Sequence, residues 1–511
     1  MVYRRALRAL LGFSLLLGQG AVAQTPPVAT RPKTAAPVKR LPTAKMPARG
    51  RRRTGAKSPA AKHAATAKRP ATKLGGTKAA TAKMATAKVV VAKTRPTIHL
   101  AARPTSPYAT AVPPAKRQAT RQETMDQINE NLANPPVGIE NAASLRPFFD
   151  QLHQLEADPK GQLVRVLQFG DSHTAADMFT GALRTLFQTK WGDGGAGFSY
   201  AGYPFAGYRI HGTKRAQSID WTIEGTRFRE LGDDALVGLG GVSLSTEQAG
   251  SWVSLDADAT SLEVQYLTQP GGGPIEIYDG EQLLTSLSTD GPIAAGHFDS
   301  PVEAGPHHFE VRTTDYAPVR LLGLTTENAS GVTYEAIGLN GAEASVFLRW
   351  DEALQQAYME QVNPGLIVLA YGTNEASDHT WSEESYAAMF RSLIERCHRL
   401  APKAAILVIG PPDRELRAGR KGWVPFAGVD RIVEAQRSIC AELGCAYWDL
   451  RSRMGGFGSM REWVSVDWAQ ADHTHFTEEG YTELAGALFL DIVHQYEADQ
   501  GLSTMAESGT K

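Results

Sequence analysis

The stretch that decides the fold is Val164-Arg165-Val166-Leu167-Gln168-Phe169-Gly170-Asp171-Ser172-His173-Thr174. Its first six residues are mostly β-branched or apolar, which is typical of a buried strand, and Gly170 then allows a tight turn. Polar residues follow at once, and a helical stretch begins near Ala175. A strand, a tight turn and a helix in this order predict one unit of an α/β fold, with Ser172 in the turn.

Two further apolar runs end in glycine in the same way, Leu366-Ile367-Val368-Leu369-Ala370-Tyr371-Gly372 and Ala405-Ile406-Leu407-Val408-Ile409-Gly410. Amphipathic helical patterns follow at residues 383–400, 430–443 and 478–496. Strands that alternate with helices predict a parallel sheet covered by helices on both faces. In such folds the ligand site lies at the carboxyl ends of the strands, where this sequence has its polar clusters.

Charge divides the chain into two contrasting parts. The sequence has 53 Lys plus Arg and 54 Asp plus Glu, yet residues 24–120 contain 22 of the basic residues and none of the acidic ones. Residues 121–511 contain 28 basic and all 54 acidic residues, which is a net charge of −26. An acidic body argues against an enzyme that acts on nucleic acid. It is also longer than one ordinary core requires, so we expect two packed units there.

Residues 1–23 have the pattern of a secretory signal peptide, with Arg4, Arg5 and Arg8 before the apolar run 9–17 and small residues before Gln24. The apolar run is shorter than the roughly 20 residues that span a bilayer, so we expect cleavage, no transmembrane span and a location in the periplasm or cell envelope. Residues 24–120 are rich in Ala, Lys, Thr, Pro and Arg and are expected to form a disordered basic linker. It is either a spacer or a tether to an anionic envelope polymer, and export excludes nucleic acid as its partner.

Between residues 200 and 334 the pattern changes to alternating apolar and polar residues with Gly-rich turns. This pattern predicts an inserted all-β unit, a β-sandwich like a carbohydrate-binding module. The insert separates two parts of the α/β core, 121–199 and 335–498, and residues 499–511 are expected to form a flexible tail. Five aromatic residues of the insert either stack on sugar rings or belong to its core: Tyr200, Tyr203, Phe205, Tyr208 and Trp221.

Four polar clusters provide candidate chemistry. Ser172 is placed as a nucleophile, because backbone N–H groups at a helix N-terminus can stabilise an oxyanion. Asp472 and His475, three residues apart, can supply a base and the carboxylate that fixes its tautomer. Asn374, in Gly372-Thr373-Asn374-Glu375, and Gly341, in Gly338-Leu339-Asn340-Gly341-Ala342, offer the donor types that an oxyanion hole requires.

The histidines and cysteines of this chain could also serve metal binding or disulfide formation. His473 and His475 could instead bind a metal ion, but no further His or Cys cluster completes such a site. We therefore expect no metal and no organic cofactor. Three cysteines exclude a disulfide scaffold, and the short spacing of Cys440 and Cys445 leaves their pairing open.

The order of the blocks resembles that of the SGNH (GDSL-type) serine esterases: Gly170-Asp171-Ser172, Gly341, Gly372-Thr373-Asn374, and Asp472 with His475. The resemblance covers about residues 163–496 and implies a three-layer SGNH-hydrolase fold. It implies that Ser172 is the nucleophile, His475 the general base and Asp472 its partner. The oxyanion hole would consist of the Ser172 N–H, the Gly341 N–H and the Asn374 side chain, surrounded by Asp171, His173 and Gly372. His173 stands where many members have leucine.

Further blocks resemble the peptidoglycan O-acetylesterases of Gram-negative bacteria, which also have a β-rich insert. These blocks include Trp191-Gly192-Asp193-Gly194-Gly195, Tyr371-Gly372-Thr373-Asn374-Glu375-Ala376 and Met454-Gly455-Gly456. The resemblance implies removal of acetyl groups from the C6 hydroxyl of N-acetylmuramic acid in O-acetylated peptidoglycan, through an acetyl-enzyme. The alternatives are an O-acetyltransferase that uses the same residues, an acetylesterase that acts on another envelope polymer or exopolysaccharide, and a non-catalytic wall-binding protein.

Overall fold

The computed structural model describes residues 114–134, 138–225 and 234–508. The predicted signal peptide and most of the predicted basic linker lie outside these residues. The linker ends earlier than predicted, because helix α2 (Pro114–Ala133) begins inside it. Arg121 fastens this helix to the body by donating to the Val466 carbonyl at 2.7 Å and by pairing with Asp467. None of the helices in the described ranges combines the length and the apolar composition that a bilayer crossing requires.

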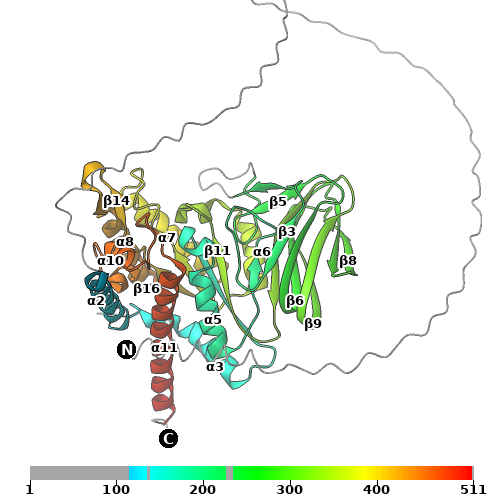
Figure 1. The fold of residues 1–511 in the computed structure, drawn as a ribbon. Coiled ribbons are helices and arrows are strands. Elements are labelled where there is room, and N and C mark those ends of the chain that lie inside the picture. Colours follow the sequence, from blue (N-terminus) through cyan, green and yellow to red (C-terminus); the bar gives the residue numbers. More distant parts are fainter. Residues whose placement is uncertain (1–113, 135–137, 226–233, 509–511) are drawn as a thin grey trace, which may run out of the picture. The chain divides into compact units, whose positions relative to one another are not determined.

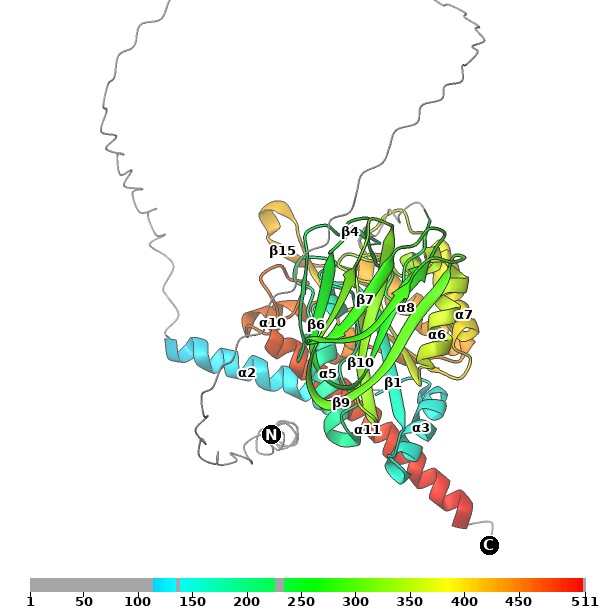
Figure 2. The ribbon, with the colours of Figure 1, turned by 90° about the vertical axis from the view of Figure 1, so that its right-hand side faces the viewer.

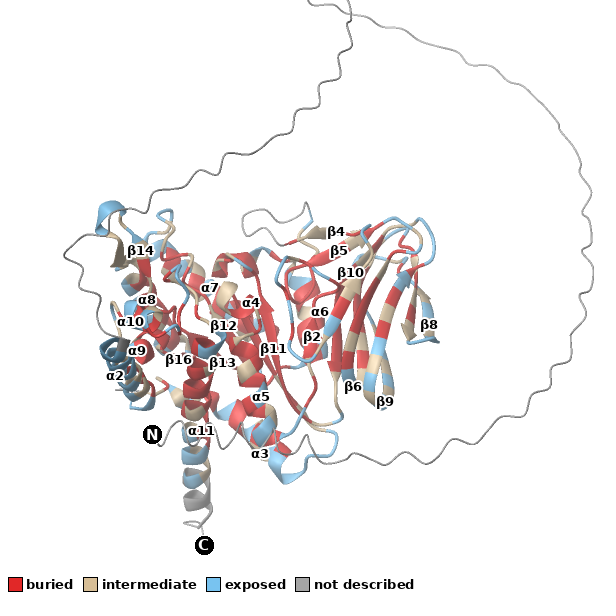
Figure 3. Ribbon diagram, viewed as in Figure 1, coloured by how far each residue is buried: buried red, intermediate tan, exposed pale blue. Residues whose placement is uncertain are grey.

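A five-stranded parallel sheet forms the centre of the α/β part (Figure 3). β1 lies between β11 and β12, and it pairs with β11 from Leu163 opposite Gly331 to Gly170 opposite Gly338. The predicted parallel sheet and its three predicted strands are confirmed. In spatial order the strands are β11 (Gly331–Gly338), β1 (Leu163–Gly170), β12 (Leu366–Ala370), β13 (Ala405–Ile409) and β16 (Ala446–Trp448).

Side chains along each strand alternate between the two faces of this sheet, as the period of two requires. In β12, Leu366 and Val368 belong to one hydrophobic core, and Ile367 and Leu369 belong to the other. The first core includes residues of α2, α3 (Arg146–Ala157), α5 (Phe179–Trp191), α9 (Leu450–Met454), α10 (Met460–Ser465) and α11 (Glu478–Ser508). The second includes residues of α6 (Glu352–Val362), α7 (Glu383–Leu400) and α8 (Gly428–Leu443). Helices on both faces give the predicted three-layer arrangement, which Figure 1 shows.

The helix ends follow from local signals. The helix predicted at 383–400 is confirmed at both ends, and the Ser382 hydroxyl caps it by accepting Ser385 N at 3.1 Å. The helix predicted at 430–443 already begins at Gly428, and it ends where Gly444 takes a left-handed φ of 77°. The helix predicted at 478–496 continues to Ser508, through most of the residues that were predicted to form a flexible tail. Gln500 still contacts α3 there, because its Nε2 donates to Glu156 at 3.5 Å.

The inserted unit is built of β-strands, nine of which form one continuous antiparallel hydrogen-bond network (Figure 2), and its arrangement as a sandwich stays a prediction. The network is continuous because one half of β6 (Trp252–Thr268) bonds to β3 and the other half to β10, while β9 (Ala294–Thr313) follows β6 along its length. All strands therefore stay in one hydrogen-bond network. The other strands are β2 (Gly197–Ser199), β3 (Lys214–Gln217), β4 (Thr222–Glu224), β5 (Ser243–Thr246), β7 (Pro274–Asp279), β8 (Gln282–Ser288) and β10 (Val319–Glu327).

The β unit begins and ends a few residues earlier than the predicted 200–334. β2 already pairs with β10, whereas β11 belongs to the parallel sheet from Gly331 onward. The unit packs on the same hydrophobic core as α6 and α7, and the Tyr358 hydroxyl of α6 donates to the Tyr266 carbonyl of β6 at 2.8 Å. Two short 3-10 helices lie in connecting segments: η1 (Ala142–Leu145) directly precedes α3, and η2 (Ala344–Arg349) lies between β11 and α6.

Candidate active site

The carboxyl ends of β1, β11 and β12 lie at one edge of the parallel sheet, and the predicted motif residues gather there. β1 ends at Gly170, and Ser172 opens the short helix α4 (Ser172–Ala175). The Asp171 carboxylate caps this helix by accepting one of its backbone N–H groups at 2.9 Å. A Cβ at Gly170 would lie 2.8 Å from the Ala370 carbonyl oxygen and would overlap the Thr174 hydroxyl. Glycine therefore allows α4 to follow the strand this closely.

Ser172, His475 and Asp472 form a continuous row of hydrogen bonds. Ser172 Oγ lies 2.7 Å from His475 Nε2, and His475 Nδ1 lies 2.7 Å from Asp472 Oδ2. The other oxygen of Asp472 accepts the backbone N–H groups of Thr474 and His475, each at 3.0 Å. An acceptor at Nδ1 favours the imidazole tautomer with its proton there, which leaves Nε2 free to accept the serine proton.

The charge of Asp472 suits this arrangement. Burial raises the pKa of the Asp472 carboxyl, but the hydrogen bonds from the side chain and backbone of His475 and from Thr474 outweigh burial and hold the pKa below its usual value. Asp472 is therefore ionised at neutral pH. A fixed carboxylate beside Nδ1 stabilises an imidazolium that forms when His475 takes up a proton.

Asn374 and the turn that contains Gly341 come from the strands on either side of β1. Asn374 Nδ2 donates to the Ala342 carbonyl at 2.9 Å and lies 3.5 Å from Asp171 Oδ2. Gly341 takes a left-handed φ of 75°, and a backbone N–H of the same turn donates to the Gly170 carbonyl at 3.0 Å. The fold thus brings Asn374 and this turn to the residues that flank Ser172.

Asp171 and His173 lie on either side of Ser172 in the chain. Burial raises the pKa of Asp171 to about 6, against the opposing effect of hydrogen bonds from the His173 backbone and from Thr373. Burial, together with the nearby His475, holds the pKa of His173 well below its usual value. His173 Nδ1 hydrogen-bonds the Tyr481 hydroxyl at 2.8 Å, and its ring lies 5.1 Å from that of His475. A neutral His173 therefore packs against His475 without adding positive charge.

Gly372 and Glu375 shape the loop that carries Asn374. Gly372 takes a left-handed φ of 127°, and a Cβ there would lie 2.8 Å from Ile432 Cγ2 of α8. The Glu375 carboxylate accepts Ala344 N at 2.7 Å and thereby ties this loop to η2. Burial raises the pKa of Glu375 to about 8. The sequence motif contains Glu375, but its burial was not predicted.

Arg414 is the neighbour of the site that sequence reasoning missed. Its Nη1 donates to the Thr373 carbonyl at 2.8 Å and to Ser377 Oγ at 3.0 Å, which holds the loop before and after Asn374. Burial lowers the pKa of Arg414, whereas Asp171 and Asp472 act to raise it, so the guanidinium is coupled to both carboxylates. Arg414 follows the carboxyl end of β13, and ligand sites in parallel sheets lie at such strand ends. Its position in the sequence could therefore have indicated Arg414 as a site residue.

His473 and His475 have different partners, which argues against a metal ion shared between them. His473 Nδ1 lies 2.5 Å from Glu415 Oε2 of β14 (Glu415–Arg417). Its ring stacks on that of Trp423 in β15 (Trp423–Pro425), with the centroids 4.1 Å apart. β14 and β15 pair as a hairpin, and η3 (Gly419–Lys421) lies between them.

The aromatic residues of the insert mostly belong to its core. Tyr200, Tyr208 and Trp221 are buried, and the rings of Tyr200 and Tyr208 meet at 4.9 Å. Of the two alternatives, the core role therefore applies to these three, and Phe205 packs against the same core. Tyr203 is 46% exposed, and its stacking on a sugar ring stays a prediction. The cysteines Cys440 and Cys445 are buried and free, with no disulfide between them.

The comparison with protein families agrees with this geometry. The model of the GDSL-like Lipase/Acylhydrolase family matches residues 293–482. The chain contains a GDSL-like lipase/acylhydrolase domain. The matched residues include Gly341, Asn374, Asp472 and His475, whereas β1 and Ser172 precede them, separated in the sequence by much of the inserted β unit.

Solved structures extend the comparison. The structure of a peptidoglycan O-acetylesterase is similar, with a TM-score of 0.60 and 26% sequence identity over 69% of this chain and 96% of that chain. A family two carbohydrate esterase from Cellvibrio japonicus is 11% identical, with a TM-score of 0.24 over 56% of this chain and 98% of its own. No curated protein matches the chain. The acylhydrolase domain makes the protein a carboxylic ester hydrolase.

Proposed function

We propose that the protein is a serine esterase that removes acetyl groups from the C6 hydroxyl of N-acetylmuramic acid in peptidoglycan. The observation that carries the chemistry is the row from Ser172 through His475 to Asp472, with both contacts at 2.7 Å. A serine hydroxyl is a weak nucleophile until an adjacent base, itself oriented by a third group, removes its proton. The row supplies these three parts in one place.

In the first step, His475 Nε2 accepts the Ser172 proton while Oγ attacks the carbonyl carbon of the acetyl ester. The new C–O bond places negative charge on the carbonyl oxygen. Its donors are the Ser172 N–H at the start of α4, the Gly341 N–H and Asn374 Nδ2, which would exchange its long contact of 3.5 Å with Asp171 Oδ2 for the oxyanion while it keeps its bond to the Ala342 carbonyl. The bond to the sugar oxygen then breaks, and the His475 imidazolium gives its proton to that oxygen.

In the second step, water hydrolyses the acetyl-enzyme. His475 takes a proton from the water as its oxygen attacks the acetyl carbonyl, and the same donors stabilise the second oxyanion. The bond to Ser172 Oγ breaks, Oγ regains its proton from His475, and acetate leaves. Asp472 stays ionised throughout, since its pKa lies below the usual value, and it stabilises the imidazolium in both steps.

The substrate assignment rests on the similar structure of a peptidoglycan O-acetylesterase, together with the sequence blocks around the site. We infer a periplasmic location from the signal-peptide pattern of residues 1–23, which would place the enzyme beside its polymer. The basic residues of the linker, 24–120, suit an anionic envelope polymer, and electrostatic attraction would then concentrate the enzyme at the wall.

Acetate release from purified O-acetylated peptidoglycan tests the proposal, with the wild-type protein beside Ser172→Ala. We expect release by the wild type and none above background by the variant. A small acetyl ester serves as a second substrate for both proteins. Hydrolysis of that ester without release from peptidoglycan would keep the serine chemistry and reject the substrate. Equal activity of the variant on both substrates would reject Ser172 as nucleophile.

Acetyl transfer is separated from hydrolysis by adding an unacetylated glycan acceptor to the same reaction. In the proposed esterase, released acetate accounts for all the acetyl groups lost from the peptidoglycan. Acetyl groups found on the acceptor would show that a sugar hydroxyl, rather than water, attacks the acetyl-enzyme.

A further inference from the structure

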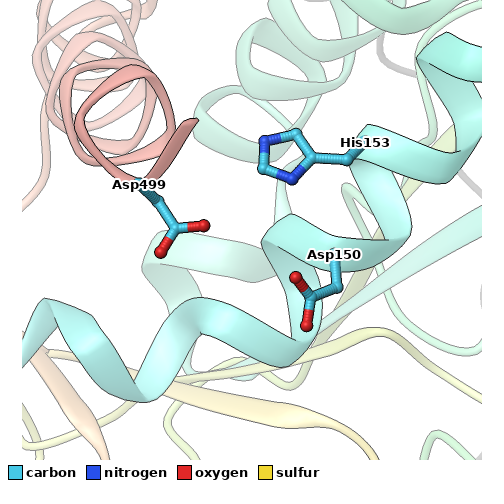
Figure 4. Close-up of side chains that lie close together, drawn as sticks. All are labelled: Asp150, His153 and Asp499. Carbon is cyan, nitrogen blue, oxygen red and sulfur yellow. The ribbon is translucent and has the colours of Figure 1, made fainter. Parts of the chain in front are cut away.

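A second cluster of side chains capable of binding a metal lies on helices α3 and α11. Asp150 and His153 come from α3 and Asp499 from α11, and one ligand atom of each lies within 4.8 Å of the other two (Figure 4). Residues three apart project from the same helix face. The same spacing of a carboxylate and a histidine supplies two ligands from one helix in helical metalloproteins.

Two polar atoms in this cluster have no hydrogen-bond partner among the described residues. They are Nε2 of His153 and Oδ2 of Asp499, and both atoms are buried. Native proteins rarely leave buried polar atoms unpaired, because such atoms lose their bonds to water and gain nothing in return. Water or a cation can satisfy them, and both atoms can donate an electron pair to a cation.

The surroundings add negative charge to the cluster. The Glu156 carboxylate, on the same helix as His153, accepts a hydrogen bond of 2.8 Å from Trp191 Nε1. This donor is neutral, so it does not offset the charge of Glu156. Lys190 lies over the rings of Trp191 and Tyr496, with its Nζ 5.2 and 5.9 Å from their centroids, and Arg146 stands one helical turn before Asp150 on α3. The His153 ring packs on Tyr496 at 4.4 Å, which limits the directions in which the imidazole can turn. A cation between the two helices would offset the charge of the aspartates.

In contrast to the expectation of no metal from the sequence, we propose that Asp150, His153 and Asp499 bind one divalent transition-metal ion. One imidazole nitrogen and two carboxylate oxygens suit Zn²⁺, Co²⁺ or Mn²⁺ better than Ca²⁺ or Mg²⁺, which prefer oxygen ligands alone. Zinc takes such ligands at about 2.0–2.2 Å, so the ligand atoms must approach to about 3.4 Å from one another. Rotation of the aspartate side chains provides this approach, and the exposed position of Asp150 leaves room for water as the fourth ligand.

The site lies away from the chemistry of Ser172. α3 precedes β1 and leads into the amino end of that strand, whereas Ser172 follows the carboxyl end of the same strand. The ion therefore takes no part in ester hydrolysis. It joins α3 to the last turns of α11, the part of this helix that extends beyond its neighbours in Figures 1 and 2.

Zinc titration of the metal-free full-length protein tests the site, with calorimetry for affinity and thermal unfolding for Tm. We expect one equivalent of Zn²⁺ to bind and to raise Tm. His153→Ala and the isosteric Asp499→Asn are expected to weaken binding at least tenfold and to abolish the rise in Tm. His494→Gln is the matched control, because His494 is an exposed histidine of α11 outside the cluster. It should keep the wild-type affinity.

Cobalt absorbance identifies the ligands independently. Nitrogen and oxygen ligands give no thiolate-to-cobalt charge-transfer band, whereas binding at the buried cysteines would give one. The proposal is overturned if zinc does not bind saturably, if the cobalt spectrum shows the thiolate band, or if His153→Ala and Asp499→Asn bind zinc as the wild type does. Circular dichroism confirms that the variants are folded. Because the readouts are affinity and Tm, loss of esterase activity has no bearing on the result.

Discussion

Replacing Asp472 with asparagine tests how the site controls its histidine. Asp472 accepts three hydrogen bonds, from Thr474 N and His475 N at 3.0 Å each and from His475 Nδ1 at 2.7 Å. Asparagine keeps an oxygen for the two backbone groups, so the loop should hold its conformation. Its NH₂ group then faces Nδ1 and donates to it, which selects the tautomer with the proton on Nε2. That tautomer cannot accept the proton of Ser172.

The size of the loss follows from the role of the base. General-base catalysis contributes about 10²- to 10⁴-fold, and the wrong tautomer removes nearly all of it. We expect Asp472→Asn to lower kcat/KM by about 10³- to 10⁴-fold, or about 4–5.5 kcal/mol of transition-state stabilisation. Asp472→Ala is expected to lose less, about 10²-fold, because the Asp472 side chain is 47% exposed and water can accept the Nδ1 proton in its place.

Initial rates on a small acetyl ester and on acetylated peptidoglycan measure these losses. Asp467→Asn is the control, because Asp467 precedes the same loop, is 77% exposed and pairs with Arg121. It should keep wild-type rates. Thermal unfolding shows whether each variant is folded. The reasoning is refuted if Asp472→Asn stays within tenfold of the wild type, or if it is more active than Asp472→Ala.

Three further predictions concern single positions. Asn374→Ala should stay folded and lose about 10²- to 10³-fold in kcat, and unchanged turnover would remove Asn374 from the mechanism. Burial raises the pKa of Glu375 from 4.5 to about 8, so its protonation stabilises the folded state at low pH, and this contribution is lost as pH rises towards 8. In the wild type the free energy of unfolding should therefore fall with rising pH by at most about 1.4 kcal/mol per pH unit through Glu375, and Glu375→Gln should remove this contribution. Denaturant unfolding from pH 5 to 9 measures it, and the same dependence of the free energy of unfolding on pH in the variant would contradict the prediction. A Cβ at Gly338 would overlap Ala175 N and lie 2.7 Å from Ala175 Cα, so Gly338→Ala should lower the free energy of unfolding by about 1–3 kcal/mol. Gly291→Ala, which would meet only Thr268 Cβ at 3.7 Å, should not, and equal loss in both would refute the steric argument.

The parts of the fold that depend on local signals were predictable. The apolar runs and the amphipathic pattern at 383–400 predicted β1, β12, β13 and α7 correctly. The inserted sheet was predicted less well, because alternation reveals strands but not their partners. β6 bonds to β3, β10 and β9, segments separated from one another in the chain, and these pairings join the strands of the unit into one hydrogen-bond network. The continuation of α11 to Ser508 also escaped prediction, since its contacts with α3 are invisible in the sequence.

By itself, the sequence determined which chemical groups stand at the ends of the strands: a serine after β1, an asparagine after β12 and an Asp-x-x-His segment before the last helix. The spacing from Asp472 and the family resemblance predicted His475 as the base, whereas the contacts of the two histidines are set by the tertiary structure. His473 and His475 are two residues apart, yet His473 meets Glu415, 58 residues away, and His475 meets Ser172, 303 residues away. Such partners are set by the packing of distant segments around the two cores, and local sequence carries no information about that packing.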